Sequence, residues 1–172
     1  ILISNQLNLG NVDSKFGQNW VGATVTRIVE GGHVDPKNIV FIGTQGYVPY
    51  REWSYAEKQG ITVITANEVN EQGIDGTVQR ALTLASDGCE SIYLSLDIGV
   101  IDSGYASGTG EIVIGGLTPQ QLIHLSRRLS YSTVIAAVDM VEVAPELDIR
   151  GRSERLAAEC IIEIIAPKVF GA

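Results

Sequence analysis

Two acidic residues that each follow an apolar run are the first candidates for chemistry in this chain. Asp97 ends the run Tyr93–Leu96, and Glu142 lies just after the apolar segment Thr133–Val138. A carboxylate in such a place can bind a divalent metal ion, or it can pair with a planar cation such as a guanidinium group. Asp97 and Glu142 are therefore the first residues to consider for binding a cation.

Glycine-rich segments follow Asp97 and would shape the loop beside it. They are Gly108-Thr109-Gly110 and Gly115-Gly116-Leu117-Thr118. No Lys-Ser/Thr pair follows the first segment, so it is not a phosphate-binding P-loop, and a tight turn is expected there. We expect Asp102, between Asp97 and these glycines, to shape the loop rather than to bind metal.

The elements that must position these residues alternate along the chain. Apolar runs predict the strands Ile1–Ser4, Asn38–Ile42, Thr62–Thr65, Ser91–Leu96 and Thr133–Val138. Amphipathic stretches predict the helices Val21–Glu30, Arg51–Gln59, Asp75–Ser86, Thr118–Leu129 and Arg152–Ile165. This alternation predicts an α/β domain over residues 1–172, with a mainly parallel sheet whose strands are buried on both faces. Ligands bind beyond the carboxyl ends of such strands, so Asp97 and Glu142 are expected on one rim.

Composition narrows the classes of partner. The formal net charge of −8 argues against nucleic acid or an anionic membrane surface as the main partner. No apolar run is long enough to span a bilayer, so no membrane association is expected. The two cysteines, Cys89 and Cys160, form no metal-binding or disulfide motif, which favours reduced thiols in a cytoplasmic protein.

Several of these segments resemble the ureohydrolase family of arginases, agmatinases and formimidoylglutamases. The run from Ser95 is similar to the family's S-x-D-x-D-x-x-D-P, and Gly115–Thr118 repeats its G-G-L-T. The segment Asp139–Pro145 is similar to its D-x-V-E-V-x-P. The resemblance implies an arginase-like three-layer α/β/α fold.

The resemblance also implies a chemistry, in which two divalent metals, usually manganese, share a hydroxide that attacks a guanidinium or amidine carbon. Asp97 matches the first Asp of the metal motif, and Glu142 matches the residue that contacts the guanidinium group. The remaining metal positions are degenerate. Gly99 stands where the second Asp should be, and the D-A-H-x-D motif aligns with Ser4, Gln6 and Asn8. The family's catalytic His aligns with Val21, so no catalytic residue is assigned.

Three functions are compatible with this pattern. The first is a catalytically impaired pseudoenzyme that serves as a subunit or as a guanidino-ligand binder and needs no cofactor. The alternative is an active, manganese-dependent, agmatinase-like hydrolase of linear amidine C–N bonds, and a purely structural interaction protein is a third possibility. Asp97 could contact a cation or only accept hydrogen bonds from loop amides, and Glu142 could contact a ligand or pair with a nearby Arg.

The partner expected for this chain is another protein. The chain starts within a predicted strand at Ile1, which suggests that N-terminal elements of the domain are absent. Uncovered apolar sheet surface usually marks an interface. We therefore expect a homo- or hetero-oligomer, with an active paralogue or an N-terminal fragment as the candidate partner.

Overall fold

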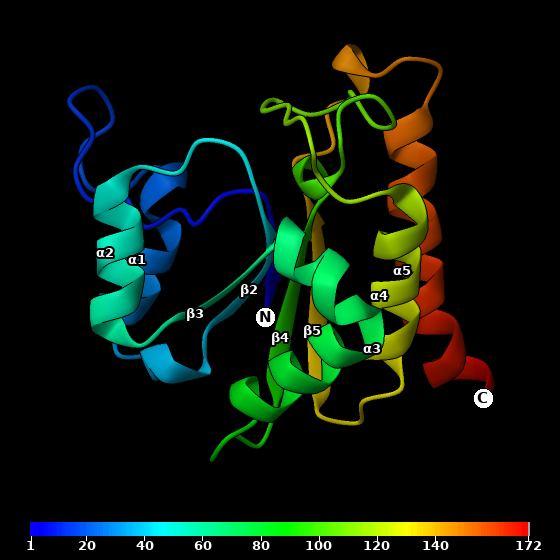
Figure 1. The fold of residues 1–172 in the computed structure, drawn as a ribbon, viewed down its shortest axis with the longest axis horizontal. Coiled ribbons are helices and arrows are strands. Elements are labelled where there is room, and N and C mark those ends of the chain that lie inside the picture. The colour runs from blue at the N-terminus through cyan, green and yellow to red at the C-terminus, as the bar shows by residue number, and fades with distance from the viewer. Residues whose placement is uncertain (172) are drawn as a thin grey trace.

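Five parallel strands form one sheet in the computed structural model, which describes residues 1–171. The strands are β1 (Leu2–Ile3), β2 (Val40–Thr44), β3 (Thr62–Thr65), β4 (Ile92–Asp97) and β5 (Ile135–Val141). Their order is β3-β2-β1-β4-β5, so β1 lies at the centre (Figure 1). The register pairs Leu2 with both Phe41 and Ser95, so all three central strands end at the same rim.

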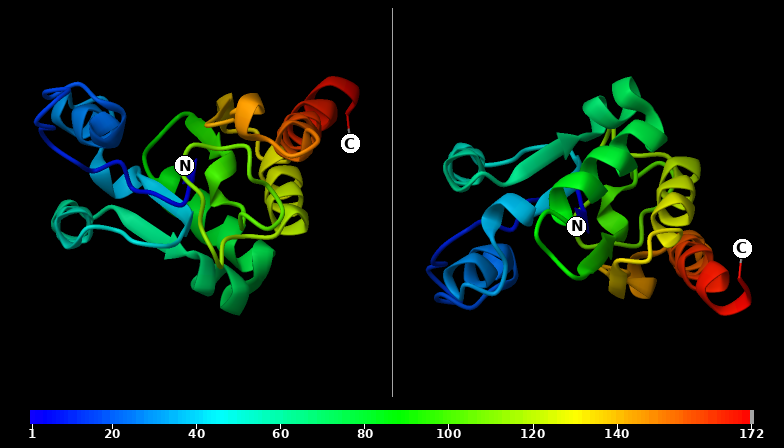
Figure 2. Two further views of the ribbon diagram at one scale, coloured as in Figure 1. Left: turned by 90° about the horizontal axis from the view of Figure 1, so that it is seen from above. Right: turned by 90° about the horizontal axis from the view of Figure 1, so that it is seen from below.

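Helices pack on both faces of this sheet. They are α1 (Thr24–Glu30), α2 (Tyr50–Gln59), α3 (Ala66–Ala85), α4 (Pro119–Ser130) and α5 (Arg152–Phe170). Residues of α3, α4 and α5 form the larger core with one face, and residues of α1 and α2 form a smaller core with the other. Figure 2 shows α1 and α2 at one end of the molecule and α5 at the other. The predicted α/β fold with a mainly parallel sheet is confirmed.

One part of the sheet differs from the prediction of strands buried on both faces. In β4, Leu94 and Leu96 are fully buried, whereas Tyr93, directly before Leu94, is 56% exposed. The hydroxyl of Tyr93 donates a 2.6 Å hydrogen bond to Asp139 of the neighbouring strand. The reason is that α1 and α2 pack over β1, β2 and β3. Within residues 1–171, the second face of β4 and β5 therefore has no helix over it.

The start of α3 also differs from the prediction, which placed it at Asp75. The hydroxyl of Thr65 accepts a hydrogen bond from the Glu68 amide, while the Glu68 carboxylate accepts one from the Thr65 amide. This capping box starts the helix at Ala66. Gly73 then adopts φ 74° and kinks the helix. The helical periodicity that predicts a helix from Asp75 therefore belongs only to the part of α3 that follows the kink at Gly73.

Other helix ends follow the expected chemistry. Thr118 caps α4, and Pro119 occupies its first position. The carboxylate of Asp148 accepts hydrogen bonds from the amides of Ser153 and Glu154 at the start of α5. Within residues 1–171, no helix is long and apolar enough to cross a membrane.

Candidate functional site

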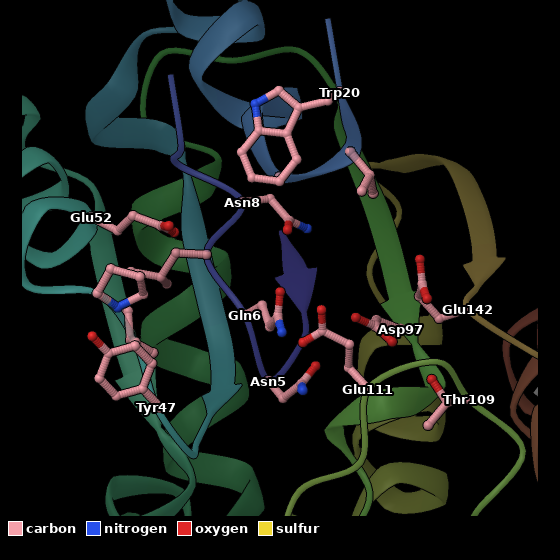
Figure 3. A pocket seen from close by; sticks show the side chains of 15 residues that line it. Asn5, Gln6, Asn8, Trp20, Tyr47, Glu52, Asp97, Thr109, Glu111 and Glu142 are labelled. Carbon is pink, nitrogen blue, oxygen red and sulfur yellow. The ribbon is translucent and has the colours of Figure 1, made fainter. Parts of the chain in front are cut away.

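A cavity of about 320 Å³ opens at the carboxyl ends of the central strands. Its lining comes from the loop after β1, the segment before α1, the start of α2, and the residues that follow β4 and β5. The polar side chains in this lining are Asn5, Gln6, Asn8, Tyr47, Glu52, Asp97, Thr109, Glu111 and Glu142 (Figure 3). The location is the one that the parallel sheet predicts for a ligand site.

Asp97 is the buried carboxylate of this cavity, and only 8% of its surface is exposed. Its Oδ2 accepts a 2.8 Å hydrogen bond from the Ser4 hydroxyl, and its Oδ1 accepts a 2.7 Å hydrogen bond from the Gly99 amide. Burial raises the pKa of Asp97 to about 6, because these hydrogen bonds offset only part of the desolvation. The carboxylates of Glu142 and Glu111 raise this pKa further by repulsion, so negative charges gather here.

Asp97, Glu111 and Glu142 together form what we call the acidic wall of the cavity. Glu142 follows β5 directly and adopts φ 64°, a left-handed conformation that is unusual for Glu. A Cβ atom added to Gly110 would lie 3.8 Å from Glu142 Oε2, so this carboxylate lies beside the glycine-rich loop. No salt bridge within residues 1–171 involves Glu142, so an Arg partner for it is not seen there.

The loop after β1 contributes neutral amides, which we call the amide wall: Asn5, Gln6 and Asn8. Gln6 and Asn8, two of the degenerate metal positions, therefore share the cavity with Asp97. Ser4 is buried and supports Asp97 by the hydrogen bond described above. Asn8 holds φ 50°, a conformation that Asn tolerates better than most residues.

Gly99 is buried and closely surrounded. A Cβ atom there would lie 3.0 Å from Asp97 Oδ1, 3.1 Å from Asn5 Oδ1 and 3.4 Å from the carbonyl oxygen of Glu111. A second metal-binding Asp at this position would therefore require these neighbouring polar atoms to move by a few tenths of an ångström.

Several residues of the cavity were missed by the sequence analysis, among them Glu111, Glu52 and Thr109. Glu52, in the first turn of α2, is largely buried, and its Oε2 accepts a 3.1 Å hydrogen bond from the Leu9 amide. Burial raises the pKa of Glu52. Thr109 is 4% exposed, and its hydroxyl has no hydrogen-bond partner. No local motif marks Glu52, whose place beside the cavity depends on the strand order, and nothing in a Gly-Thr-Gly triplet signals an unpaired hydroxyl.

The donor set does not fit a binuclear metal centre. Within residues 1–171, no group of three or more His, Cys, Asp or Glu side chains is placed to hold a metal ion. Gln6 and Asn8 are neutral, Gly99 has no side chain, and the Ser4 hydroxyl is engaged with Asp97. Hard divalent cations are held mainly by carboxylate charge. The arrangement is better suited to an organic cation that spreads its charge over several hydrogen-bond donors.

Comparison with known proteins agrees with this architecture. The chain is 34% identical to guanidinopropionase of Pseudomonas aeruginosa over 157 residues, which cover 89% of this chain and 48% of that protein. It is 35% identical to the human mitochondrial guanidino acid hydrolase over 167 residues, which cover 91% of this chain and 45% of that protein. The chain thus spans about half the length of these curated relatives.

A solved structure supports the same fold. Formimidoylglutamase from Bacillus subtilis superposes with a TM-score of 0.91 at 22% identity, covering 97% of this chain and 52% of that one. Residues 9–166 match the Arginase family. With the parallel sheet, the rim cavity and the retained Asp97 and Glu142, this match shows that the chain belongs to the arginase, or ureohydrolase, family.

Proposed function

We propose that this chain is a catalytically impaired member of the family that binds a guanidino or amidine group in the rim cavity without a binuclear manganese centre. The observation that carries the proposal is the contrast between the two walls. The acidic wall keeps its carboxylates, whereas the amide wall offers only neutral groups where the family motif has metal ligands. One wall is enough to pair with a planar cation, but it is not enough to neutralise two divalent ions.

The acidic wall has the chemistry that such a cation needs. A guanidinium group presents several N–H donors in one plane, and a carboxylate accepts them in pairs. Asp97 at the base, with Glu142 and Glu111 beside it, provides such acceptors around one part of the cavity. Bound cation would also offset the repulsion among the three carboxylates.

The alternative function is an active, manganese-dependent hydrolase of linear amidine C–N bonds. The names of the two relatives favour it, since both indicate enzymes acting on guanidino compounds. This function would require metal ligands beyond those that residues 1–171 supply.

Metal content and urea release separate the two functions. We expect the purified protein, loaded with Mn²⁺ and freed of excess metal, to contain far less than two Mn²⁺ per chain. Agmatine and arginine should release no urea above the background of an Asp97→Ala variant, while calorimetry with chelator-treated protein should detect binding of a simple alkylguanidine. Two bound Mn²⁺ per chain with sustained turnover would establish the active enzyme instead, and absence of guanidine binding would refute the binding role.

The proposal includes a role as a subunit. One edge of β5 is unpaired within the described sheet, and α5 exposes the apolar side chains of Ile162, Ile165 and Val169. A free strand edge beside apolar surface is a ready place for another strand to add. The occupant is a second chain or an N-terminal segment of the same domain.

Sedimentation velocity tests this role. We expect the protein to sediment as an oligomer, and a lysine in β5, Ala137→Lys, to weaken the association, because edge lysines oppose strand addition. The exposed position Gln79→Lys on α3 is the control. A monodisperse, stable monomer in both variants and in the unmodified chain would refute the subunit role.

A further inference from the structure

Exposed apolar side chains gather at the entrance of the cavity. Tyr47 lines the cavity and is 90% exposed, and Tyr50, at the start of α2, is exposed as well. Val21 lines the cavity from the segment before α1 and is also exposed. Figure 3 shows Tyr47 on the far side of Gln6 from the acidic wall. The entrance is therefore partly apolar, although the interior of the cavity is polar.

The loop between β4 and α4 adds to the same surface. The side-chain amide of Gln45 donates a 3.4 Å hydrogen bond to the Ile114 carbonyl, and Gln45 lies two residues before Tyr47. This contact holds the two loops together. The side chain of Ile114 is 84% exposed, and that of Ile112 is exposed too. These residues together form what we call the apolar mouth of the cavity: Val21, Tyr47, Tyr50, Ile112 and Ile114.

A small ligand would leave most of the apolar mouth uncovered. The cavity has a volume of about 320 Å³, the size of a small-molecule site. Tyr50, Ile112 and Ile114 do not line it, so a small guanidine at the acidic wall would leave these side chains in water. Clustered exposed apolar side chains usually mark contact with another macromolecule, and Tyr is enriched in protein interfaces. The apolar mouth therefore favours an occupant that is larger than the cavity.

The charges of the cavity determine which group of that occupant enters. Asp97, Glu111 and Glu142 form the acidic wall, and Glu52 adds a further carboxylate on α2. Among the described residues, no Lys, Arg or His lines the cavity, and the exposed Arg51 lies outside the lining. A carboxylate of the ligand would find no cationic partner there. A guanidinium group that is attached to neutral peptide groups would instead meet the acidic wall and the amide wall together.

From these observations we infer that the site binds an arginine residue of another polypeptide. The guanidinium group enters the cavity and pairs with the acidic wall, and the neighbouring peptide groups form hydrogen bonds with the amide wall. Apolar residues on either side of the arginine pack on the apolar mouth. Arg and Tyr are also among the residue types that contribute most to the affinity of protein interfaces. The inference rests on the proposed function, because it takes the guanidino group in the cavity to be a side chain of a partner protein.

Capped pentapeptides test the inference by calorimetry on the chelator-treated protein, with butylguanidine as the small ligand. The first peptide has a central arginine flanked by leucines, the second has glycines in place of the leucines, and the third has citrulline in place of the arginine. We expect the first to bind about tenfold more tightly than butylguanidine, because it also buries apolar surface. The glycine-flanked peptide should bind about as weakly as butylguanidine. The citrulline peptide should bind at least tenfold more weakly than the first, because its side chain is uncharged.

Three variants assign the parts of the site. Ile112→Ser combined with Ile114→Ser should remove the advantage of the leucine-flanked peptide and leave butylguanidine binding unchanged, because neither side chain lines the cavity. Glu111→Gln should weaken both arginine peptides and butylguanidine by the same factor, because it acts on the shared guanidinium group. Tyr131→Ser removes an exposed side chain at the end of α4 and is the control, which should leave every affinity unchanged. Thermal melts show whether any substitution disturbs the fold.

The outcomes separate this inference from the proposed function. Binding of butylguanidine without any gain for the leucine-flanked peptide would overturn the inference and leave guanidine binding in place. Tighter binding of free arginine than of this peptide would overturn it too, and so would equal binding of the citrulline and arginine peptides. Unchanged peptide affinity after loss of Ile112 and Ile114 would also contradict it. Failure of butylguanidine and of every peptide to bind would refute both the inference and the function on which it rests.

Discussion

The acidic wall and the amide wall lie in one cavity, yet they have opposite electrostatic character. Asp97 at the end of β4 is held by two hydrogen bonds, and its pKa is raised by burial and by the neighbouring carboxylates. Gln6 and Asn8, after β1, carry no charge at any pH. A pair of divalent ions requires charge on both sides of the site, whereas one guanidinium group requires it on one side. The proposed function depends on this contrast, because the acidic wall alone supplies the carboxylates that a single guanidinium group requires.

The largest effect is expected when a second carboxylate is placed beside Asp97. Gly99→Asp should lower the free energy of unfolding by about 3 kcal/mol, because its Cβ approaches atoms of both walls and its charge is buried beside another. Urea denaturation measures this change.

Two further variants separate the contributions to this loss of unfolding free energy. Gly99→Ala adds only the Cβ atom, so its smaller loss isolates the steric part. Asn5→Ala combined with Gly99→Asp removes one of the close contacts and should recover part of the stability. Strong stabilisation of Gly99→Asp by Mn²⁺ would contradict the contrast between the walls, because it would show that one added carboxylate rebuilds the metal site.

Replacing Asp97, at the base of the acidic wall, with a neutral residue is expected to have a smaller effect on the free energy of unfolding, and this effect should depend on pH. The pKa of Asp97 is raised to about 6 in the folded chain, above its value in an unfolded chain, so ionised Asp97 costs stability. The cost should be absent below about pH 4, should grow as the pH rises toward 6, and should then stay constant. Asp97→Asn should therefore match the unmodified chain at low pH and exceed its unfolding free energy by roughly 2–3 kcal/mol at pH 7.

Denaturation curves over this pH range check the prediction. Asn can still accept from the Gly99 amide and can donate to the Ser4 hydroxyl, so the fold should be preserved. Asp87→Asn, at an exposed position, is the control and should show no such pH dependence. A constant difference between Asp97→Asn and the unmodified chain at all pH values would contradict the assigned cause.

The smallest effect is expected at Thr109. Thr109→Val keeps the shape and removes a hydroxyl that has no partner, so the free energy of unfolding should stay the same or rise by about 1 kcal/mol. Affinity for butylguanidine should fall about fivefold, because the ligand loses one acceptor. Thr77→Val is the matched control, since the buried Thr77 hydroxyl donates to the Gly73 carbonyl and its loss should destabilise the fold. Unchanged affinity in Thr109→Val would exclude this hydroxyl from the site.

Local patterns in the sequence predicted most of the fold. The strand Thr62–Thr65 has the predicted bounds, and the other strands lie within a few residues of theirs. The early part of α3 was missed, because its Thr65–Glu68 capping box precedes a glycine kink that interrupts the helical period. The exposed face of β4 and β5 was missed too, since an apolar run does not reveal whether a helix covers both of its sides.

The site was less predictable than the fold. Asp97 and Glu142 could be identified, because each directly follows a strand whose position the apolar pattern marks. Glu52 could not, because its distance from Asp97 depends on the strand order β2-β1-β4, which no local motif encodes. The unpaired state of the Thr109 hydroxyl depends on how the loop folds against its neighbours, so it is visible only in three dimensions.

The close packing around Gly99 has an evolutionary consequence. The family motif has Ala where Asn5 stands, and the Asn5 amide oxygen lies 3.1 Å from the place that a Cβ at residue 99 would take. Asn5 and Gly99 therefore fit each other, and a reversion at either position meets a chain already adapted to the other. An acidic side chain at residue 99 alone would have to displace these neighbouring atoms, so we expect it to lower the stability of the fold. Under the proposed function, a carboxylate at residue 99 would therefore return readily only together with a change at Asn5.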